Sequence, residues 1–180
     1  MIAEAAWQEF SLRKVLFIPS GDTPNKDMHH IDKNIRYAMV EKAIEGNGHF
    51  MISPIERDRQ GPSYTVDTIR ILQREFGDDY EFYFICGTDA VADLPTWKYN
   101  RELLSACHFI CASRPGNENE IQKSIDYFGE LERKKIHFLK TPELAISSTI
   151  LRDWIAEKRS VRYLIPDAVI DMIRSNKLYE

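Results

Sequence analysis

The segment Phe82-Tyr83-Phe84-Ile85-Cys86-Gly87-Thr88-Asp89 contains the pattern on which the predicted fold depends. Its apolar run is long enough for a strand buried on both faces, and Gly87 ends the run where a ligand can approach the backbone closely. Such strands are typical of parallel sheets covered by helices, in which sites form at the carboxyl ends of the strands. The segment therefore predicts a buried parallel strand with a site at its end.

Four further apolar runs of this kind occur along the chain, each bounded by Pro, Gly or charged residues. They cover residues 15–18, 50–52, 109–112 and 136–139. Between and after these runs, apolar residues recur at helical spacing. The predicted inner faces are Ile35, Met39 and Ala43; Val66, Ile69 and Leu72; Ile121, Ile125 and Phe128; Ile150, Leu151, Trp154 and Ile155; and a last helix within residues 166–178. The alternation predicts an α/β fold with a parallel sheet and helices on both faces.

Length and composition fit a single domain spanning residues 1–180. The chain is 43% hydrophobic and 11% aromatic, which is enough apolar material for a sizeable core. Its net charge of −4 argues against binding to nucleic acid, which relies on concentrated Lys and Arg. No apolar run approaches the roughly 18 residues that cross a bilayer, and the first residues look like part of a helix rather than a signal peptide. We therefore expect a soluble, cytoplasmic protein with no membrane partner.

The cysteines and histidines do not predict a metal site. An odd number of cysteines without paired spacing fits a reducing compartment, so we expect no disulfides. Cys107 and Cys111 flank an apolar run without two further ligands, and we interpret them as small buried apolar residues. His29 and His30 are adjacent and project differently. Motifs of hydrolases, metalloproteases and kinases are also missing from the sequence.

Residues 146–152, Ile-Ser-Ser-Thr-Ile-Leu-Arg, place hydroxyl groups at a predicted helix start and an arginine one turn inside it. Free backbone N–H groups, the positive end of the helix dipole and the Arg152 guanidinium then converge, which suits a phosphate. Arg152 lies four residues after Ser148, so both project on the same side of the helix. We hypothesise that Ser147, Ser148 and Arg152 bind phosphate; a serine cap beside a surface arginine is the open alternative.

Two further strand ends carry residues that suit a nucleotide. Gly87 allows close approach to the backbone, and Asp89 is suited to accept hydrogen bonds from ribose hydroxyls. Arg114 follows the next predicted strand and adds a cation at the same edge of the sheet. Lys26, in a polar loop after the first predicted strand, is placed to swing over a triphosphate. A capped turn and solvated side chains are the alternatives.

Another set of residues suits a planar acid. Trp97 lies in a loop next to Pro95, where its ring could stack on a heterocycle or pack against the core. Residues 61–67, Gly-Pro-Ser-Tyr-Thr-Val-Asp, combine a turn with a helix start. The N–H groups of that helix start and the Thr65 hydroxyl suit a small carboxylate.

In their order along the chain, these residues resemble those of bacterial nicotinate-nucleotide adenylyltransferases, a branch of the nucleotidyltransferase superfamily. The matches span nearly the whole chain: residues 17–19, 24–26, Arg36, Met39, Glu56, and residues 61–68, 87–89, 94–97, 114–116, 146–152, 163–166 and 178–180. The Ser-Ser-Thr-x-x-Arg motif marks the superfamily broadly. Gly-Pro-Ser-Tyr-Thr and Leu-Pro-x-Trp indicate the nicotinate branch.

The resemblance implies a Rossmann-like domain that transfers AMP from Mg²⁺-ATP to nicotinate mononucleotide and releases pyrophosphate. It implies that ATP phosphates and adenosine are bound by one set of residues and nicotinate mononucleotide by another. The first set is Ser147, Ser148, Arg152, Arg114, Gly87 and Asp89, with Lys26 assisting over the phosphates; the second is Tyr64, Thr65 and Trp97. Mg²⁺ is expected because it accompanies ATP. A homo-oligomer is an open possibility.

The sequence departs from the family pattern at its start. Family members begin with a strand and a Gly-Gly-x-Phe-Asp-Pro-x-His-x-Gly-His segment, whose two histidines contact the phosphates of ATP. Residues 1–4 resemble the helix that follows this segment, and neither His29 nor His30 has the spacing to replace the pair. We expect the first strand and both histidines to be absent from these 180 residues, and a chain limited to them to fold poorly and show little activity.

Two other functions stay open on the sequence alone. One is adenylyl transfer to a different acceptor, nicotinamide mononucleotide or phosphopantetheine. The other is a nucleotide-binding module without catalysis.

Overall fold

The computed structural model describes residues 1–21, 31–112, 118–142 and 146–180. The chain forms two compact units, and each is assembled from two separate stretches of sequence. Unit 1 contains Met1–Arg13 and Tyr64–Glu143, and unit 2 contains Lys14–Ser63 and Leu144–Glu180. No helix within the described ranges is both long enough and apolar enough to cross a membrane.

The sheet of unit 1 has three parallel strands in the order β3-β4-β5. They are β3 (Tyr83–Gly87), β4 (His108–Ala112) and β5 (Ile136–Leu139). The central strand is the most deeply buried, and Phe109, Ile110 and Cys111 are all fully inaccessible to solvent. Three of the predicted strands are thus confirmed, with ends shifted by at most one residue.

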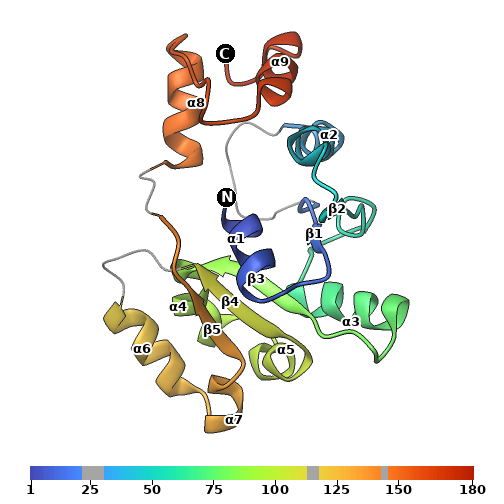
Figure 1. The fold of residues 1–180 in the computed structure, drawn as a ribbon, viewed down its shortest axis with the longest axis vertical. Coiled ribbons are helices and arrows are strands. Elements are labelled where there is room, and N and C mark those ends of the chain that lie inside the picture. Colours follow the sequence, from blue (N-terminus) through green and yellow to red (C-terminus); the bar gives the residue numbers. More distant parts are fainter. Residues whose placement is uncertain (22–30, 113–117, 143–145) are drawn as a thin grey trace. The chain divides into compact units, whose positions relative to one another are not determined.

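Helices cover both faces of this sheet, as the sequence predicts. On one face, Ala6 of α1 (Ile2–Glu9) packs against Ile110 and Leu139. On the other, the ring of Phe84 contacts those of Phe109 and Trp97, which follows the 3₁₀ helix η1 (Leu94–Thr96). The other described helices of unit 1 are α3 (Thr65–Phe76), α4 (Thr88–Asp93), α5 (Asn100–Ala106), α6 (Glu118–Tyr127) and α7 (Glu130–Arg133) (Figure 1).

The described residues of unit 2 form a smaller parallel sheet and the helices α2, α8 and α9 (Figure 1). Its strands are β1 (Val15–Phe17) and β2 (Phe50–Ile52), joined by α2 (Lys33–Ile44). The other helices are α8 (Ser148–Ala156) and α9 (Asp167–Ser175), and α9 packs against α2.

Burial in unit 2 differs from the sequence-based expectation. The apolar run of β2 predicted a strand buried on both faces, yet Met51 is 44% exposed. In the described part of the chain the sheet of unit 2 has two strands, so each strand has one strand neighbour, and α2 is the helix that packs on β2. One face of β2 is therefore left accessible.

Candidate functional site

The start of α8 in unit 2 has the local structure that the sequence predicts. Ser147 is the N-cap, and its hydroxyl accepts a hydrogen bond from the backbone N–H of Ile150 at 3.1 Å. The helix begins at Ser148, so the N–H groups of its first turn point out of the helix start with the positive end of the dipole. A serine cap at this helix start is thus confirmed, and both the phosphate hypothesis and its alternative, a serine cap beside a surface arginine, predict it.

Arg152 lies one turn inside α8 and keeps its charge uncompensated. Its guanidinium donates to the Thr149 hydroxyl at 3.2 Å, and it forms no ion pair with any carboxylate of the described residues. A cation held beside a helix start but not neutralised by the protein is suited to an anionic ligand.

A second arginine of unit 2, Arg36 of α2, is fixed by neutral partners. It donates hydrogen bonds to the carbonyl of Ile31 at 3.3 Å, the hydroxyl of Ser20 at 3.2 Å and the carbonyl of Gly21 at 2.9 Å. Gly21 packs closely against the backbone of Glu56, because a Cβ added at Gly21 would lie 2.3 Å from the Glu56 carbonyl oxygen. Arg36 thus fixes Ser20 and Gly21, which follow β1.

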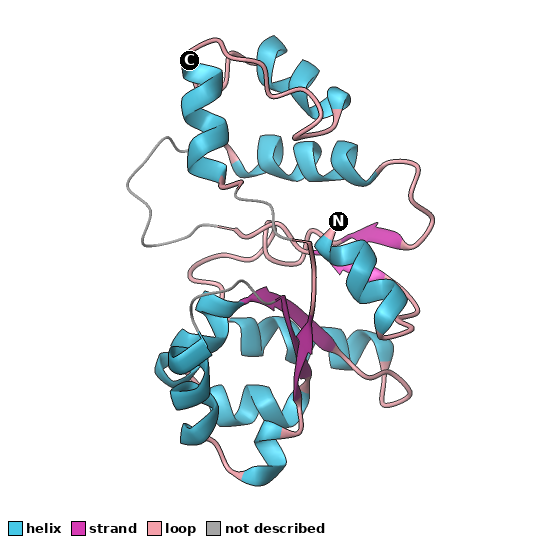
Figure 2. Cartoon of the chain, turned by 60° about the vertical axis from the view of Figure 1, so that its left-hand side comes forward, coloured by secondary structure: helices cyan, strands magenta, loops and turns pink. Residues whose placement is uncertain are grey.

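Tyr179 connects these two arginines electrostatically. Burial raises the pKa of its hydroxyl, and the positive charges of Arg152 and Arg36 oppose that rise. Tyr179 follows α9, which packs on α2, and both views place the C-terminus beside α8 (Figures 1 and 2). From the sequence, Arg36 and Tyr179 are only positions that match the family, because contacts between residues so far apart leave no periodic signal.

In unit 1, the end of β3 leads directly into α4, which begins at Thr88. Gly87 has an ordinary φ of −86°, and no described atom lies within 4 Å of the position of an added Cβ. The open space beside this strand end, rather than an unusual backbone, makes it accessible to a ligand. Asp89 lies in the first turn of α4, close enough to Cys111 for its charge to add to the burial that raises that thiol's pKa to about 11.

The residues predicted to bind the nicotinate part lie at the start of α3 and after η1. Tyr64 is the N-cap of α3 without a side-chain cap, and Thr65 is the first helical residue. Trp97 is half-buried and packs edge-on against Phe84, with ring centroids 6.0 Å apart. Part of the Trp97 ring thus packs against the core, which was the alternative to stacking on a heterocycle.

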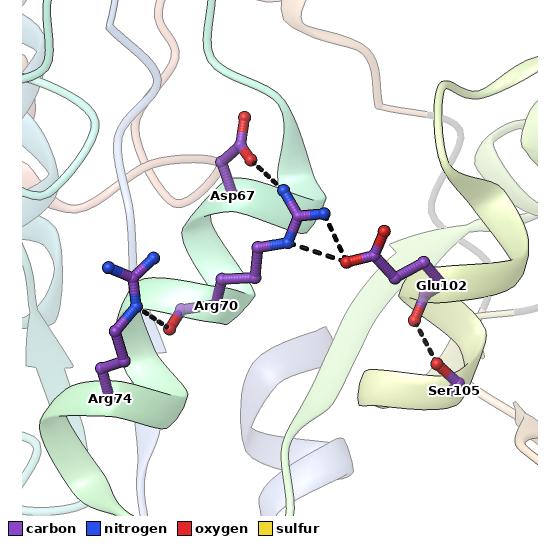
Figure 3. Close-up of polar contacts among 5 residues, drawn as sticks. All are labelled: Asp67, Arg70, Arg74, Glu102 and Ser105. Atoms are coloured by element: carbon purple, nitrogen blue, oxygen red, sulfur yellow. Dashed lines mark hydrogen bonds and ion pairs between the residues drawn. The ribbon is translucent and has the colours of Figure 1, made fainter.

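An ion-pair network fixes the start of α3 against α5 (Figure 3). Arg70 donates to Asp67 at 2.7 Å and to Glu102 through Nε at 2.8 Å, with a second, very short contact from Nη2 to the same Glu102 oxygen. Glu102 lies in α5, so the network connects two helices of unit 1. Because the three side chains are 37–44% exposed, we regard the network as fixing orientation more than adding stability.

The cysteines are structural. Cys107 and Cys111 are 1% and 0% exposed, which confirms their interpretation as buried small residues, and Cys86 is partly buried. Burial raises the pKa of Cys107 and of Cys86 to about 12. These thiols are protonated at neutral pH and do not serve as nucleophiles.

The predicted residues thus form two described groups. Ser147, Ser148 and Arg152 lie in unit 2, whereas Tyr64, Thr65, Gly87, Asp89 and Trp97 lie in unit 1. Lys26 and Arg114, with His29 and His30, lie outside the described residues.

Comparison with known proteins identifies the class. The family model described as cytidylyltransferase-like matches residues 1–153. The chain thus belongs to the cytidylyltransferase-like family.

The curated relatives narrow the class further. The probable nicotinate-nucleotide adenylyltransferase of Moorella thermoacetica is 44% identical over 179 residues, covering 98% of this chain and 82% of its own. The Thermoanaerobacter protein of the same description is 41% identical over 180 residues, covering 99% and 85%. This chain belongs to the nicotinate-nucleotide adenylyltransferase family.

A solved structure supports the fold. The nicotinic acid mononucleotide adenylyltransferase of Plasmodium falciparum, complexed with NaAD, matches with a TM-score of 0.74 at 19% identity, covering 99% of this chain and 90% of that one.

Proposed function

We propose that this protein transfers the adenylyl group of ATP to nicotinate mononucleotide, giving deamido-NAD and pyrophosphate in NAD biosynthesis. The observation that carries the proposal is the start of α8 in a chain of this family. Ser147 caps the helix, and Arg152 forms no ion pair among the described residues, which suits an anionic substrate. We further propose that residues 1–180 act as one catalytic domain.

The reaction needs no nucleophile from the protein. A 5′-phosphate oxygen of nicotinate mononucleotide attacks the α-phosphorus of ATP, the new P–O bond forms, and the bond to the bridging oxygen breaks as pyrophosphate leaves. Catalysis then depends on holding two anionic substrates in line and on stabilising the charge that develops at the α-phosphorus. The high pKa values of Cys86 and Cys107 are consistent with a route that uses no thiol.

The residues divide between these tasks. Ser148 and Arg152 hold the ATP phosphates together with Ser147, and Arg114 and Lys26 contribute further positive charge. Gly87 and Asp89 line the adenosine site. Tyr64, Thr65 and Trp97 bind the nicotinate mononucleotide, with the first N–H groups of α3 meeting its carboxylate.

A divalent metal is part of this chemistry, and we propose Mg²⁺ delivered with ATP. The described residues contain no group of three His, Cys, Asp or Glu side chains that could hold a metal ion. Mg²⁺ is commonly held by substrate phosphates and water with few protein ligands, so this arrangement fits it. When bound, the ion neutralises phosphate charge. Free thiols in the chain fit a cytoplasmic setting for the reaction.

Pyrophosphate release from Mg²⁺-ATP tests the proposal, with nicotinate mononucleotide, nicotinamide mononucleotide and phosphopantetheine compared as acceptors. The assay is run on this chain and on one extended upstream through any encoded His-containing segment. We expect the nicotinate acceptor to give the highest kcat/KM. Preference for phosphopantetheine would overturn the assignment, and ATP binding without pyrophosphate release in either chain would favour a nucleotide-binding module.

A further inference from the structure

Lys98 occupies a specific place among the residues assigned to the nicotinate. It follows Trp97 directly, and its ammonium lies 4.7 Å from the ring centroid of Tyr64 and 5.1 Å from that of Tyr99. Tyr64 is the N-cap of α3. The lysine therefore brings a positive charge from the segment after η1 to the start of α3, within unit 1.

The backbone fixes this position. The chain turns sharply at Tyr99, which has φ 60° and ψ 34°, a left-handed conformation that costs energy in a residue other than glycine. The side chain of Asn100 donates to the Pro95 carbonyl at 2.7 Å, and the N–H of Trp97 donates to the Leu94 carbonyl at 3.0 Å. Lys98 is thus held in an ordered turn between η1 and α5.

The neighbouring charges leave Lys98 uncompensated. The Tyr99 ring that Lys98 approaches also lies 5.6 Å from the guanidinium of Arg70. Arg70 binds the carboxylates of Asp67 and Glu102 (Figure 3). Lys98 forms no ion pair with any carboxylate of residues 1–21, 31–112, 118–142 and 146–180. Among the described residues, Arg70 thus binds these two carboxylates, and the Lys98 ammonium faces the Tyr64 ring without an ion pair.

We propose that Lys98 is a specificity-determining residue that selects the acid over the amide form of the mononucleotide. This inference rests on the proposed function, because it assumes that the pyridine ring binds near Tyr64, Thr65 and Trp97. The lysine acts on the substrate's carboxylate by charge and takes no part in transfer of the adenylyl group.

Backbone N–H donors discriminate only partly between the acid and the amide mononucleotide, and the positive charge of Lys98 adds to that discrimination. The two mononucleotides have nearly the same shape and differ in one negative charge. An amide can turn its carbonyl oxygen toward the N–H groups at the start of α3 and so recover part of their hydrogen bonding. It has no net charge with which to attract an ammonium group. Lys98 therefore favours the acid whichever way the substituent is turned.

The test compares both acceptors in the parent chain, or the extended chain where turnover requires it, and in Lys98→Met, Lys98→Glu and Lys98→Arg. Lys98→Met is expected to lower kcat/KM for the acid about fivefold through KM, the size of an exposed ion pair. Lys98→Glu lowers it on the order of tenfold or more, because attraction becomes repulsion, and Lys98→Arg retains the preference. Turnover of the amide stays within about twofold throughout, since the amide has no charge to lose.

Calorimetry measures the equilibrium binding of each mononucleotide, and the ratio of the two affinities is a second measure of the preference for the acid over the amide. The matched control is Lys123→Met, an exposed lysine on α6 of the same unit. Equal losses of kcat/KM for the acid and the amide would mean that Lys98 is merely structural. An unchanged acid-to-amide ratio in Lys98→Glu would overturn this inference and leave the proposed function standing. Failure of the parent chain to bind or turn over either mononucleotide would overturn the proposed function and this inference with it.

Discussion

Unit 1 and unit 2 differ in how they are built and in what they present. Most of the buried apolar side chains of the described residues lie in unit 1, around the inaccessible strand β4. Unit 2 has few: Val15, Val161, Val169, Ile170 and Ile173. Its helices α2 and α8 contain no fully buried residue, yet they carry Arg36 and Arg152. The well-packed unit 1 thus carries the groups proposed for the pyridine ring and adenosine, and the thinly packed unit 2 carries Arg152, which is proposed for the phosphates.

The largest expected effect tests the packing difference directly. Phe109→Ala removes a ring that is 0% exposed, and we expect it to lower the free energy of unfolding by about 3–5 kcal/mol. Phe17→Ala in unit 2 removes a half-buried ring, 5.0 Å from that of Phe50, and is expected to cost about half as much. Urea unfolding measures both losses.

The natural tryptophans can report the two units separately. Trp7 and Trp97 lie in unit 1 and Trp154 lies in unit 2, so a Trp154→Phe background follows unit 1 alone. Equal losses for Phe109→Ala and Phe17→Ala would contradict the comparison and show that unit 2 is packed as tightly as unit 1.

The next effect is on activity rather than stability. Arg152→Ala is expected to lower kcat/KM for ATP by about 10²-fold, because it removes a charge aimed at developing negative charge. Its melting temperature should hardly change, since Arg152 is not fully buried and has no ion pair among the described residues. Arg159→Ala, on the same unit with its guanidinium over Trp154, is the matched control. A similar loss of activity in both variants would rule out a specific role for Arg152.

A smaller effect is expected at the cap of α8. Ser147→Ala removes the acceptor for the Ile150 N–H and should destabilise the helix by about 1 kcal/mol. Ser147→Asp keeps an acceptor and should preserve the helix. Hydrogen exchange of the amides of α8 is the measurement. Unchanged exchange in Ser147→Ala would show that the cap contributes little to this helix.

The smallest effect is a pH dependence confined to unit 1. His108 lies beside His137, with Nδ1 and Nε2 2.9 Å apart and Tyr83 stacked on its ring. Burial first, then the charges of His137 and Lys135, lower the pKa of His108. An unfolded histidine titrates near pH 6.5, so below about that pH the unfolded chain binds a proton that the folded chain resists. The melting temperature should therefore fall as the pH drops through that range.

Replacing the ring isolates this contribution. His108→Phe keeps an aromatic ring and cannot be protonated, so its melting temperature should vary less with pH between about 7 and 5. An identical pH profile in His108→Phe and the parent chain would contradict the assignment.

The local sequence pattern determined much of the secondary structure of this protein. The five strands and the longer helices α2, α3, α6, α8 and α9 follow from apolar runs and helical spacing, and the cap at Ser147 follows from residue type at a helix start. The short helices α4, α5 and α7 were not predicted, because four to seven residues are too few for a periodic signal. The placement of Lys26 and Arg114 stays a prediction.

Tertiary structure alone decided how distant segments meet. In the described residues the strands form two sheets, although each apolar run looked equally suited to one. The contact of Lys98 with Tyr64, and the coupling of Tyr179 to Arg36 and Arg152, join residues far apart in sequence. Periodicity reports which side of an element is buried, since that depends on neighbours in the chain. Which partner covers that side, and which charge is left unpaired, depends on the folded arrangement of the whole unit.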